Sequence, residues 1–147
     1  MGCTTLHVPR KPSTQRGSLT MHKEIISTPL APSAIGPYSQ AVRAGDLLFV
    51  SGQIPIDPST GKLIDDRSIK GQTQRVLENL LAIVAAAGGS AENVLKTTVF
   101  LRDMEDFAEM NAAYSDFFRS SPPARSTIEA ARLPRDVSVE IDCIAII

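Results

Sequence analysis

The stretch IKGQTQRVLENLLAIVAAAGG, residues 69–89, is strongly periodic and decides the fold of the chain. Seven of its residues recur at spacings of three and four: Ile69, Thr73, Val76, Leu77, Leu80, Leu81 and Val84. This spacing places them on one face of an α-helix. Gly88 and Gly89 predict where the helix ends, because glycine readily adopts the left-handed conformation found after a helix C-terminus. Such a helix needs an apolar surface to cover.

Strand-like segments on both sides of this helix supply that surface. Short runs rich in β-branched and apolar residues occupy 23–27, 38–43 and 47–51 before the helix, and 94–101, 125–130 and 137–147 after it. Gly45 predicts a tight hairpin turn between the second and third runs. The segment from Asp57 to Lys62 predicts an exposed turn, because proline, aspartate and serine all favour turns.

A second helix is predicted between the fourth and fifth runs. Asp103 is placed to cap its start, and Pro122-Pro123 stops it. One face carries Phe107, Met110, Tyr114, Phe117 and Phe118. The order β-β-β-α-β-α-β-β predicts an α+β fold, with one six-stranded mixed sheet and both helices on one face.

The face of this sheet without helices is predicted to mediate self-association. In the last strand, Val139, Ile141 and Cys143 share one face, whereas Ile144 and Ile146 point to the other. A single chain has nothing left to cover that second apolar face. We therefore expect copies of the chain to cover it for one another.

Length and composition predict a single domain over residues 22–147. Residues 1–21 are polar, carry Arg10, Lys11 and Arg16 without any acid, and are predicted to be a disordered N-terminal extension. We expect a cytoplasmic protein, because no apolar run is long enough to cross a membrane, with a mitochondrial leader as the less favoured alternative. Cys3 and Cys143 lie at opposite ends of the chain, which argues against a structural disulfide.

Composition also limits the chemistry. The only histidines, His7 and His22, lie in or beside the N-terminal extension, so a histidine-based triad or an ordinary zinc site within the domain is not expected. No nucleotide-binding glycine motif occurs. Residues 23–147 hold 12 basic residues against 16 acidic ones and the chain has no Trp, so a nucleic-acid partner is not favoured. Catalysis would have to use carboxylates, arginine, tyrosine, hydroxyls, amides and water, with no cofactor.

Glu140 stands out because it lies in the middle of the last predicted strand, on the same face as Asp142. A carboxylate is costly to bury in an apolar strand, so it usually has a cation or a hydrogen-bond donor beside it, and its pKa is often shifted. One interpretation is a catalytic acid–base group. The other is a solvated carboxylate on the outer face of an edge strand.

Arg125 begins the preceding strand, and an antiparallel return of the chain would bring its guanidinium close to Glu140 or Asp142. A planar guanidinium suits bidentate binding of a substrate carboxylate, but a structural salt bridge between neighbouring strands explains the pattern equally well. Asn111, on the apolar face of the second helix, is either a pocket amide or a local backbone partner. Tyr38 is either a pocket aromatic or an ordinary strand residue.

Several motifs, in order along residues 23–147, closely resemble the Rid (YjgF) family. They are IGPYSQA (35–41), SGQIP (51–55), KTTVFL (96–101), NAAY (111–114), and PARST (123–127) with ARLP (131–134). Together they span the whole domain in the expected order, which makes the resemblance far more specific than any single motif.

The resemblance implies a chorismate-mutase-like (YjgF-like) fold, a homotrimer, and active sites between subunits that hydrolyse 2-imino acids or enamines to 2-keto acids and ammonia. It implies that Arg125 binds the substrate carboxylate and that Glu140 positions or activates water. The residues implied to line the pocket are Tyr38, Ser51, Gly52, Asn111 and Thr127. At Thr127 some relatives have a cysteine, so thiol-based regulation at that position is not expected here.

Two other classes of function stay open at this stage. Some relatives are described as translation inhibitors with ribonuclease activity, although the acidic domain predicts weak RNA binding. A non-catalytic protein that binds small carboxylates would need Arg125 but not Glu140. The retained arginine favours the deaminase.

Overall fold

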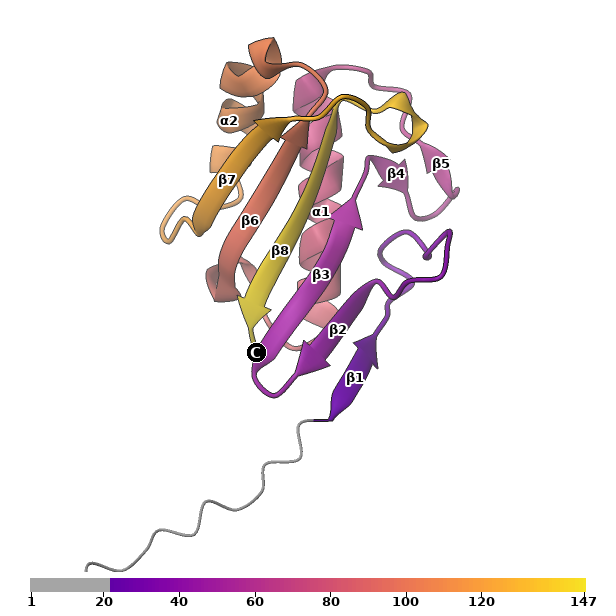
Figure 1. Ribbon diagram of the computed structural model, residues 1–147, viewed down its shortest axis with the longest axis vertical. Helices are drawn as coiled ribbons and strands as arrows, with labels where there is room; N and C mark the ends of the chain where they lie inside the picture. Colours follow the sequence, from indigo (N-terminus) through magenta and orange to yellow (C-terminus); the bar gives the residue numbers. More distant parts are fainter. Residues whose placement is uncertain (1–21) are drawn as a thin grey trace, which may run out of the picture.

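The computed structural model describes residues 22–147 and confirms the predicted α+β architecture (Figure 1). The predicted disordered extension, residues 1–21, lies outside the described residues. The elements are β1 Lys23–Ile26, β2 Ala41–Ala44, β3 Leu47–Gln53, β4 Ile56–Asp57, β5 Lys62–Leu63, α1 Ile69–Ala86, η1 Ala91–Asn93, β6 Val94–Leu101, η2 Met104–Asp106, α2 Phe107–Ser115, β7 Ala124–Glu129, η3 Pro134–Asp136 and β8 Val139–Ile146.

Six strands form one mixed sheet in the order β1-β2-β3-β8-β6-β7. The only parallel pair among them is β6 with β7, and the other neighbours are antiparallel. Figure 1 shows both helices behind the sheet, as the sequence predicts. The chain reaches the parallel pair because α2 and its flanking loops carry it back from one end of the sheet to the other.

Four details differ from the expectations. The second strand begins at Ala41 rather than at Tyr38, because the backbone N–H of Tyr38 donates to the Gly36 carbonyl in a tight turn. Asp103 caps η2 by accepting from the Glu105 N–H, and α2 begins only at Phe107. The turn after Asp57 lies within a two-stranded hairpin, β4–β5, that the sequence did not predict. The fourth difference is that β7 pairs with β6 and not with β8, which separates the candidate site residues.

The main core lies between α1 and the sheet. The predicted helical face is buried apart from the partly buried Leu81, and Val76, Leu77 and Leu80 are fully inaccessible in the same core as Val139 and Ile141 of β8. Gly88 has a φ of +95° directly after the helix, as its role in ending the helix requires. The buried face of α1 therefore fixes which face of β8 points inward and leaves Glu140 and Asp142 on the other face.

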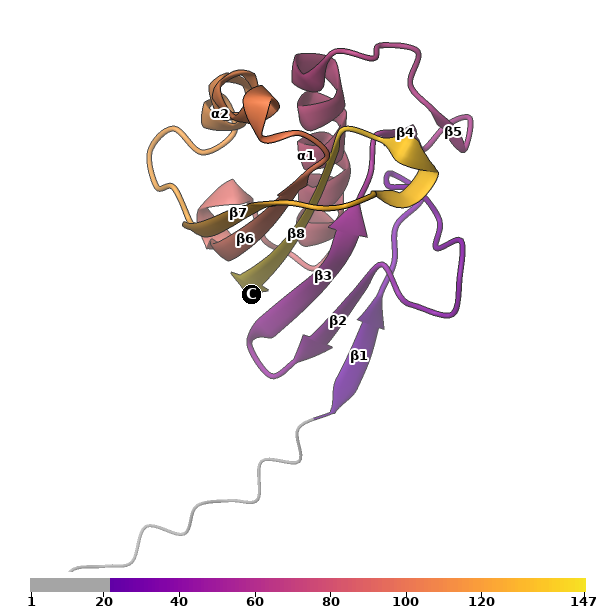
Figure 2. The same cartoon turned by 45° about the horizontal axis from the view of Figure 1, so that its top comes forward.

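A second, smaller hydrophobic cluster lies at one end of the sheet. Its buried members are Ile54, Ile56, Leu133 and Val137. Ile54 and Ile56 lie just before and within β4, and Leu133 and Val137 lie in the loop that precedes β8. Figures 1 and 2 both place the β4–β5 hairpin beside that loop. Ile54 and Ile56 of this cluster also line a cavity at the end of β3.

Candidate functional site

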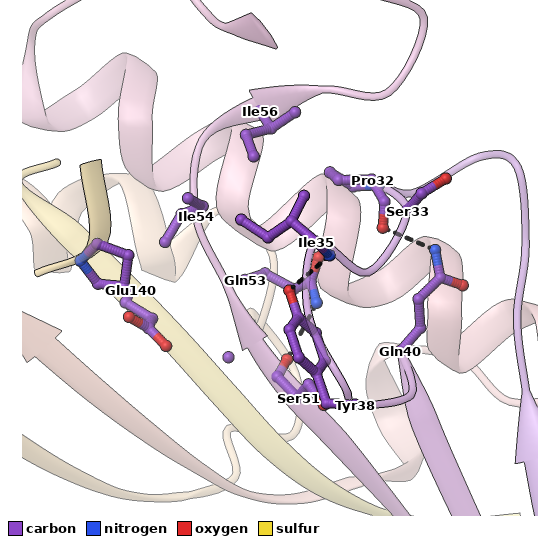
Figure 3. Close-up of a pocket in the computed structure, with 12 residues that line it drawn as sticks. Pro32, Ser33, Ile35, Tyr38, Gln40, Ser51, Gln53, Ile54, Ile56 and Glu140 are labelled. Atoms are coloured by element: carbon purple, nitrogen blue, oxygen red, sulfur yellow. Dashed lines mark hydrogen bonds between the residues drawn. The ribbon is translucent and has the colours of Figure 1, made fainter. Parts of the chain in front are cut away.

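A cavity of about 370 Å³ opens at the end of β3, and four of the residues predicted to belong to the site line it. They are Tyr38, Ser51, Gly52 and Glu140, here called the Glu140 half-site. Figure 3 labels Tyr38, Ser51 and Glu140. Tyr38 precedes β2, Ser51 and Gly52 belong to β3, and Glu140 belongs to β8. The sheet brings them together because β3 and β8 are antiparallel neighbours.

Glu140 is half-buried on a central strand, since β8 lies between β3 and β6. The interpretation of a solvated carboxylate on an edge strand is therefore wrong. Burial raises the pKa of the Glu140 carboxyl, and the nearby negative charge of Asp142 raises it further. A carboxyl with a raised pKa exchanges protons nearer to neutral pH, which suits general acid–base chemistry.

Gly52 lies directly against the Glu140 carboxyl. A Cβ atom added at Gly52 would overlap this carboxyl group. The backbone comes so close because the β3–β8 register shifts between Val50 and Gln53, which inserts one extra residue opposite β8. The absence of a side chain at residue 52 thus allows the carboxylate to lie on the floor of the cavity.

Gln40 is a cavity residue that the sequence analysis did not single out. Its side chain is 6% exposed, and its amide nitrogen donates to the carbonyls of Thr28, Ala31 and Pro32 at 3.1, 3.2 and 2.8 Å. Its amide oxygen accepts from the Thr28 N–H at 2.7 Å. This amide anchors the loop before Tyr38, and only its place in the IGPYSQA motif could have pointed to it.

Hydrogen bonds also fix Ser51 and Tyr38. The Ser51 hydroxyl donates to the Ser39 carbonyl at 2.6 Å, and the Ser51 N–H donates to the Gln40 carbonyl at 3.0 Å. The Tyr38 hydroxyl accepts from the Ile35 N–H at 3.3 Å. The Ser51 hydroxyl therefore holds the loop in place, while the Tyr38 side chain stays half-exposed at the mouth of the cavity.

The remaining predicted residues gather elsewhere, between α2 and the outer strand β7. They are Asn111, Arg125 and Thr127, here called the Arg125 half-site. The guanidinium carbon of Arg125 lies 4.7 Å from the centre of the Tyr114 ring and 5.7 Å from that of Phe107. A cation over two aromatic faces is held without an ion pair. Among residues 22–147, no carboxylate lies within 4 Å of this guanidinium.

Asn111 lies between these two aromatic residues on α2, four positions after Phe107 and three before Tyr114, so it shares their face. Its Oδ1 atom is buried and has no hydrogen-bond partner among the described residues. The amide oxygen of Asn111 therefore does not bond to the local backbone, which was the alternative interpretation of this residue. An unpaired buried acceptor on the helix face that supports Arg125 is suited to a ligand donor.

The structure contradicts the predicted antiparallel return of Arg125 toward Glu140 and Asp142. Strand β7 pairs with β6 in parallel, and β6 separates it from β8. Arg125 aligns with Thr97 and Cys143 on the helix side of the sheet, whereas Glu140 aligns with Phe100 on the opposite side. Within one chain, the two half-sites therefore lie on different faces of the sheet.

Two further observations concern the described residues as a whole. Between residues 22 and 147, no three His, Cys, Asp or Glu side chains cluster in a way that could hold a metal ion. None of the helices there is both long enough and apolar enough to span a membrane.

Comparison with known proteins identifies the family. Residues 28–147 match the model of the Endoribonuclease L-PSP family. The chain belongs to this family, also known as the Rid or YjgF family. The YjgF-like fold predicted from its motifs is confirmed, because solved structures of Rid proteins share it.

Three relatives illustrate the range of names in the Rid family. A RutC family protein of Pyrococcus horikoshii is 55% identical over 123 residues, which cover 84% of this chain and 97% of the relative. The 2-iminobutanoate/2-iminopropanoate deaminase of Salmonella typhimurium is 49% identical, over 82% of this chain and 95% of the enzyme. The crystal structure of E. coli TdcF with bound serine has a TM-score of 0.80 and 46% identity, over 84% and 98% of the two chains.

Proposed function

We propose that this Rid protein hydrolyses 2-imino acids and their enamine tautomers to 2-keto acids and ammonia, at sites shared between copies of the chain. The observation that carries the proposal is the division of the site into two complementary halves. The Glu140 half-site has a cavity and a carboxylate, and the Arg125 half-site has a guanidinium and an unpaired amide oxygen. An imino acid needs both a cation for its carboxylate and an acid–base group at its imine carbon.

Association of copies would join the two halves. The helix-free face of the sheet exposes Ile25, Leu47, Phe49, Ile128 and Ile146, each by 40–64%. An apolar face of this kind favours association with another copy. We propose the homotrimer that the family resemblance implies, in which the Arg125 half-site of one copy closes the cavity of the next.

The proposed reaction requires few groups, because the imine carbon is already electrophilic. Arg125 would bind the substrate carboxylate through parallel N–H donors, and the Asn111 oxygen would accept a hydrogen bond from the substrate. Glu140 would take a proton from water as the water oxygen bonds to the imine carbon, and the protonated carboxyl would return this proton to the imine nitrogen. In the resulting carbinolamine, the hydroxyl loses its proton to the Glu140 carboxylate and the amino nitrogen gains it as the carbon–nitrogen bond breaks, which releases ammonia and leaves the keto acid.

The relatives support this choice of reaction over the alternatives. A protein 49% identical to this chain is named as an imino acid deaminase, and the relative solved with serine binds an amino acid that has the same carboxylate and α-nitrogen as the proposed substrates. The family model carries the name endoribonuclease, so RNA cleavage is the alternative to test. Cleavage of RNA would need a surface that attracts phosphates, whereas the domain is acidic overall.

The test couples the protein to threonine dehydratase, which releases 2-iminobutanoate, and traps the surviving imine with semicarbazide. We expect the wild-type protein to reduce the trapped imine, and Arg125→Ala to behave like buffer while keeping the same assembly size in solution. The same preparations are incubated with single-stranded RNA. Imine loss equal to that in buffer, for small and aromatic imines alike, would overturn the proposal, and RNA cleavage that depends on Arg125 would replace it.

A further inference from the structure

The cavity has an apolar side that the proposed chemistry does not use. Figure 3 shows Ile35, Ile54 and Ile56 above Tyr38 and Ser51. All five residues line the same cavity, and Glu140 is the single charged residue of its lining among the described residues. The polar side suits the reacting carbon and nitrogen, which leaves the apolar side for the substrate's own side chain.

The backbone at Ile54 and Ile56 forms a tight three-residue turn. The Ile56 N–H donates to the Ile54 carbonyl at 2.7 Å, and Pro55 between them fixes its own φ at a value that this turn accepts. The two isoleucines are 9% and 4% exposed and belong to the small cluster with Leu133 and Val137, separate from the main core. A separate cluster can vary in shape without changes to the packing of α1 on the sheet.

Helix α1 holds this turn through a buried amide. Asn79 is 1% exposed, and its nitrogen donates to the carbonyls of Ile54 and Ile56 at 3.3 and 2.8 Å. A buried amide in an apolar helix face is costly unless it is paired. Here the nitrogen has both partners, whereas the Oδ1 atom has none among the described residues. Pairing both carbonyls with one amide fixes where the two isoleucine side chains enter the cavity.

We infer that Ile54 and Ile56 form the subsite for the substrate side chain and determine specificity, with Asn79 as a positioning residue. The inference rests on the proposed function. The subsite accepts 2-imino acids with uncharged aliphatic side chains, because burial against isoleucine stabilises apolar groups. It excludes acidic side chains, since these would be desolvated beside the Glu140 carboxylate.

The test measures kcat/KM with imines made by an amino-acid oxidase from alanine, leucine, phenylalanine and glutamate. We expect Ile56→Ala to raise the ratio of phenylalanine-derived to alanine-derived turnover about tenfold or more, because removed methylene groups leave room for a larger side chain. Ile56→Val, a gentler change, should shift the ratio in the same direction. Ile56→Phe should shift it the opposite way by lowering turnover of the phenylalanine-derived imine.

Leu63→Ala is the matched control. Leu63 pairs with Ile56 in the β4–β5 hairpin and packs against the same cluster, but it does not line the cavity. We expect it to lower the melting temperature without a change in the specificity ratio. Equal shifts for Leu63→Ala and Ile56→Ala, or none for any Ile56 variant, would overturn the subsite while wild-type turnover still upholds the deaminase. No turnover of any imine by the wild type would overturn the proposed function itself.

Asn79→Leu tests the positioning residue. Without the two amide hydrogen bonds, we expect KM for the leucine-derived imine to rise several-fold while kcat for the alanine-derived imine stays unchanged. If Asn79 had only a structural role, the substitution would lower the amount of folded protein and leave KM unchanged for the leucine-derived and the alanine-derived imine alike. That result would remove Asn79 from the subsite.

Discussion

The two half-sites are held in place by different kinds of interaction. In the Glu140 half-site, hydrogen bonds and close backbone approach fix the geometry, with Gln40 anchoring the loop and Gly52 allowing Glu140 to lie against β3. In the Arg125 half-site, the rings of Phe107 and Tyr114 support the guanidinium. Stacking occupies the flat face of Arg125 and leaves its N–H edges available to a ligand.

The two half-sites show how a domain without a catalytic histidine can arrange acid–base chemistry. The carboxylate lies where burial raises its pKa, and the cation lies on the opposite face of the same sheet, where it cannot neutralise that carboxylate within one chain. We infer that the two meet only across copies.

Mixed assemblies of two inactive variants should recover activity. Arg125→Ala and Glu140→Gln should each lower kcat/KM about 100-fold or more, because each removes a group that contacts the substrate or its water. The two variants are then unfolded and refolded together in equal amounts. Half of the copies carry an intact Glu140 half-site, and the other half carry an intact Arg125 half-site. Shared sites should then recover about a quarter of the wild-type rate in random mixtures.

The control for this recovery is to mix the two variants without refolding, so that copies do not exchange. Recovery only after refolding supports a shared site. Mixtures that stay inactive although mass spectrometry finds mixed assemblies would mean that each site lies within one chain.

Glu140→Gln also tests the acid–base role through pH. A general base works only when ionised, so activity is present above the pKa of Glu140 and is lost as pH falls through it. Because burial raises that pKa, the loss should begin at a higher pH than for an ordinary glutamate. In the wild type, a profile of kcat/KM against pH should fall toward low pH, and this fall is the acid limb. In Glu140→Gln, kcat/KM should be about 100-fold lower and should not show the acid limb. A limb that persists in the variant would assign it to another group.

Gly52→Ala should lower kcat/KM about tenfold by displacing the Glu140 carboxyl, since small misplacements of catalytic groups are costly. The control is the same substitution in the Glu140→Gln background, analysed as a double-mutant cycle. If Gly52 acts through Glu140, Gly52→Ala should lower kcat/KM only slightly further in the Glu140→Gln variant. Full additivity of the two effects would mean that Gly52 acts on the substrate directly.

The smallest effect is expected on stability in the Arg125 half-site. The hydroxyls of Thr97 and Tyr114 are 2.7 Å apart in the core, so Tyr114→Phe leaves the Thr97 hydroxyl buried without this partner. The free energy of unfolding in urea should fall by about 1–2 kcal/mol. Tyr38→Phe removes a hydroxyl on an exposed side chain, where water can replace its hydrogen bond from the Ile35 N–H, and should change the free energy of unfolding by less than about 0.5 kcal/mol. Equal losses for the two variants would contradict a structural role for the buried pair.

Much of the fold could be predicted because local patterns repeat along single elements. The spacing in residues 69–89 marks one helical face, and the alternation in β8 marks which side chains point inward, as the burial of Val139 and Ile141 confirms. The anomaly at Glu140 was visible for the same reason. The hairpin β4–β5 was not, because two residues per strand are too few for a pattern to emerge.

The positions of the site residues relative to one another could not be predicted from local patterns. Strand pairing is a long-range property, and nothing near Arg125 in the sequence specifies that β7 lies parallel to β6. The importance of Gln40 and Asn79 was hidden as well, because their hydrogen bonds reach carbonyls up to 12 and 25 residues away.

The type and order of the main elements, the family, and the residue types available for chemistry follow from the amino-acid sequence, because periodicity and motifs are local properties. The position of Glu140 in a cavity against Gly52, and that of Arg125 on the other face over two aromatic rings, emerge only when the whole domain folds. The physical reason is that side-chain direction alternates along each strand, whereas the neighbour of a strand is chosen by the packing of the whole domain.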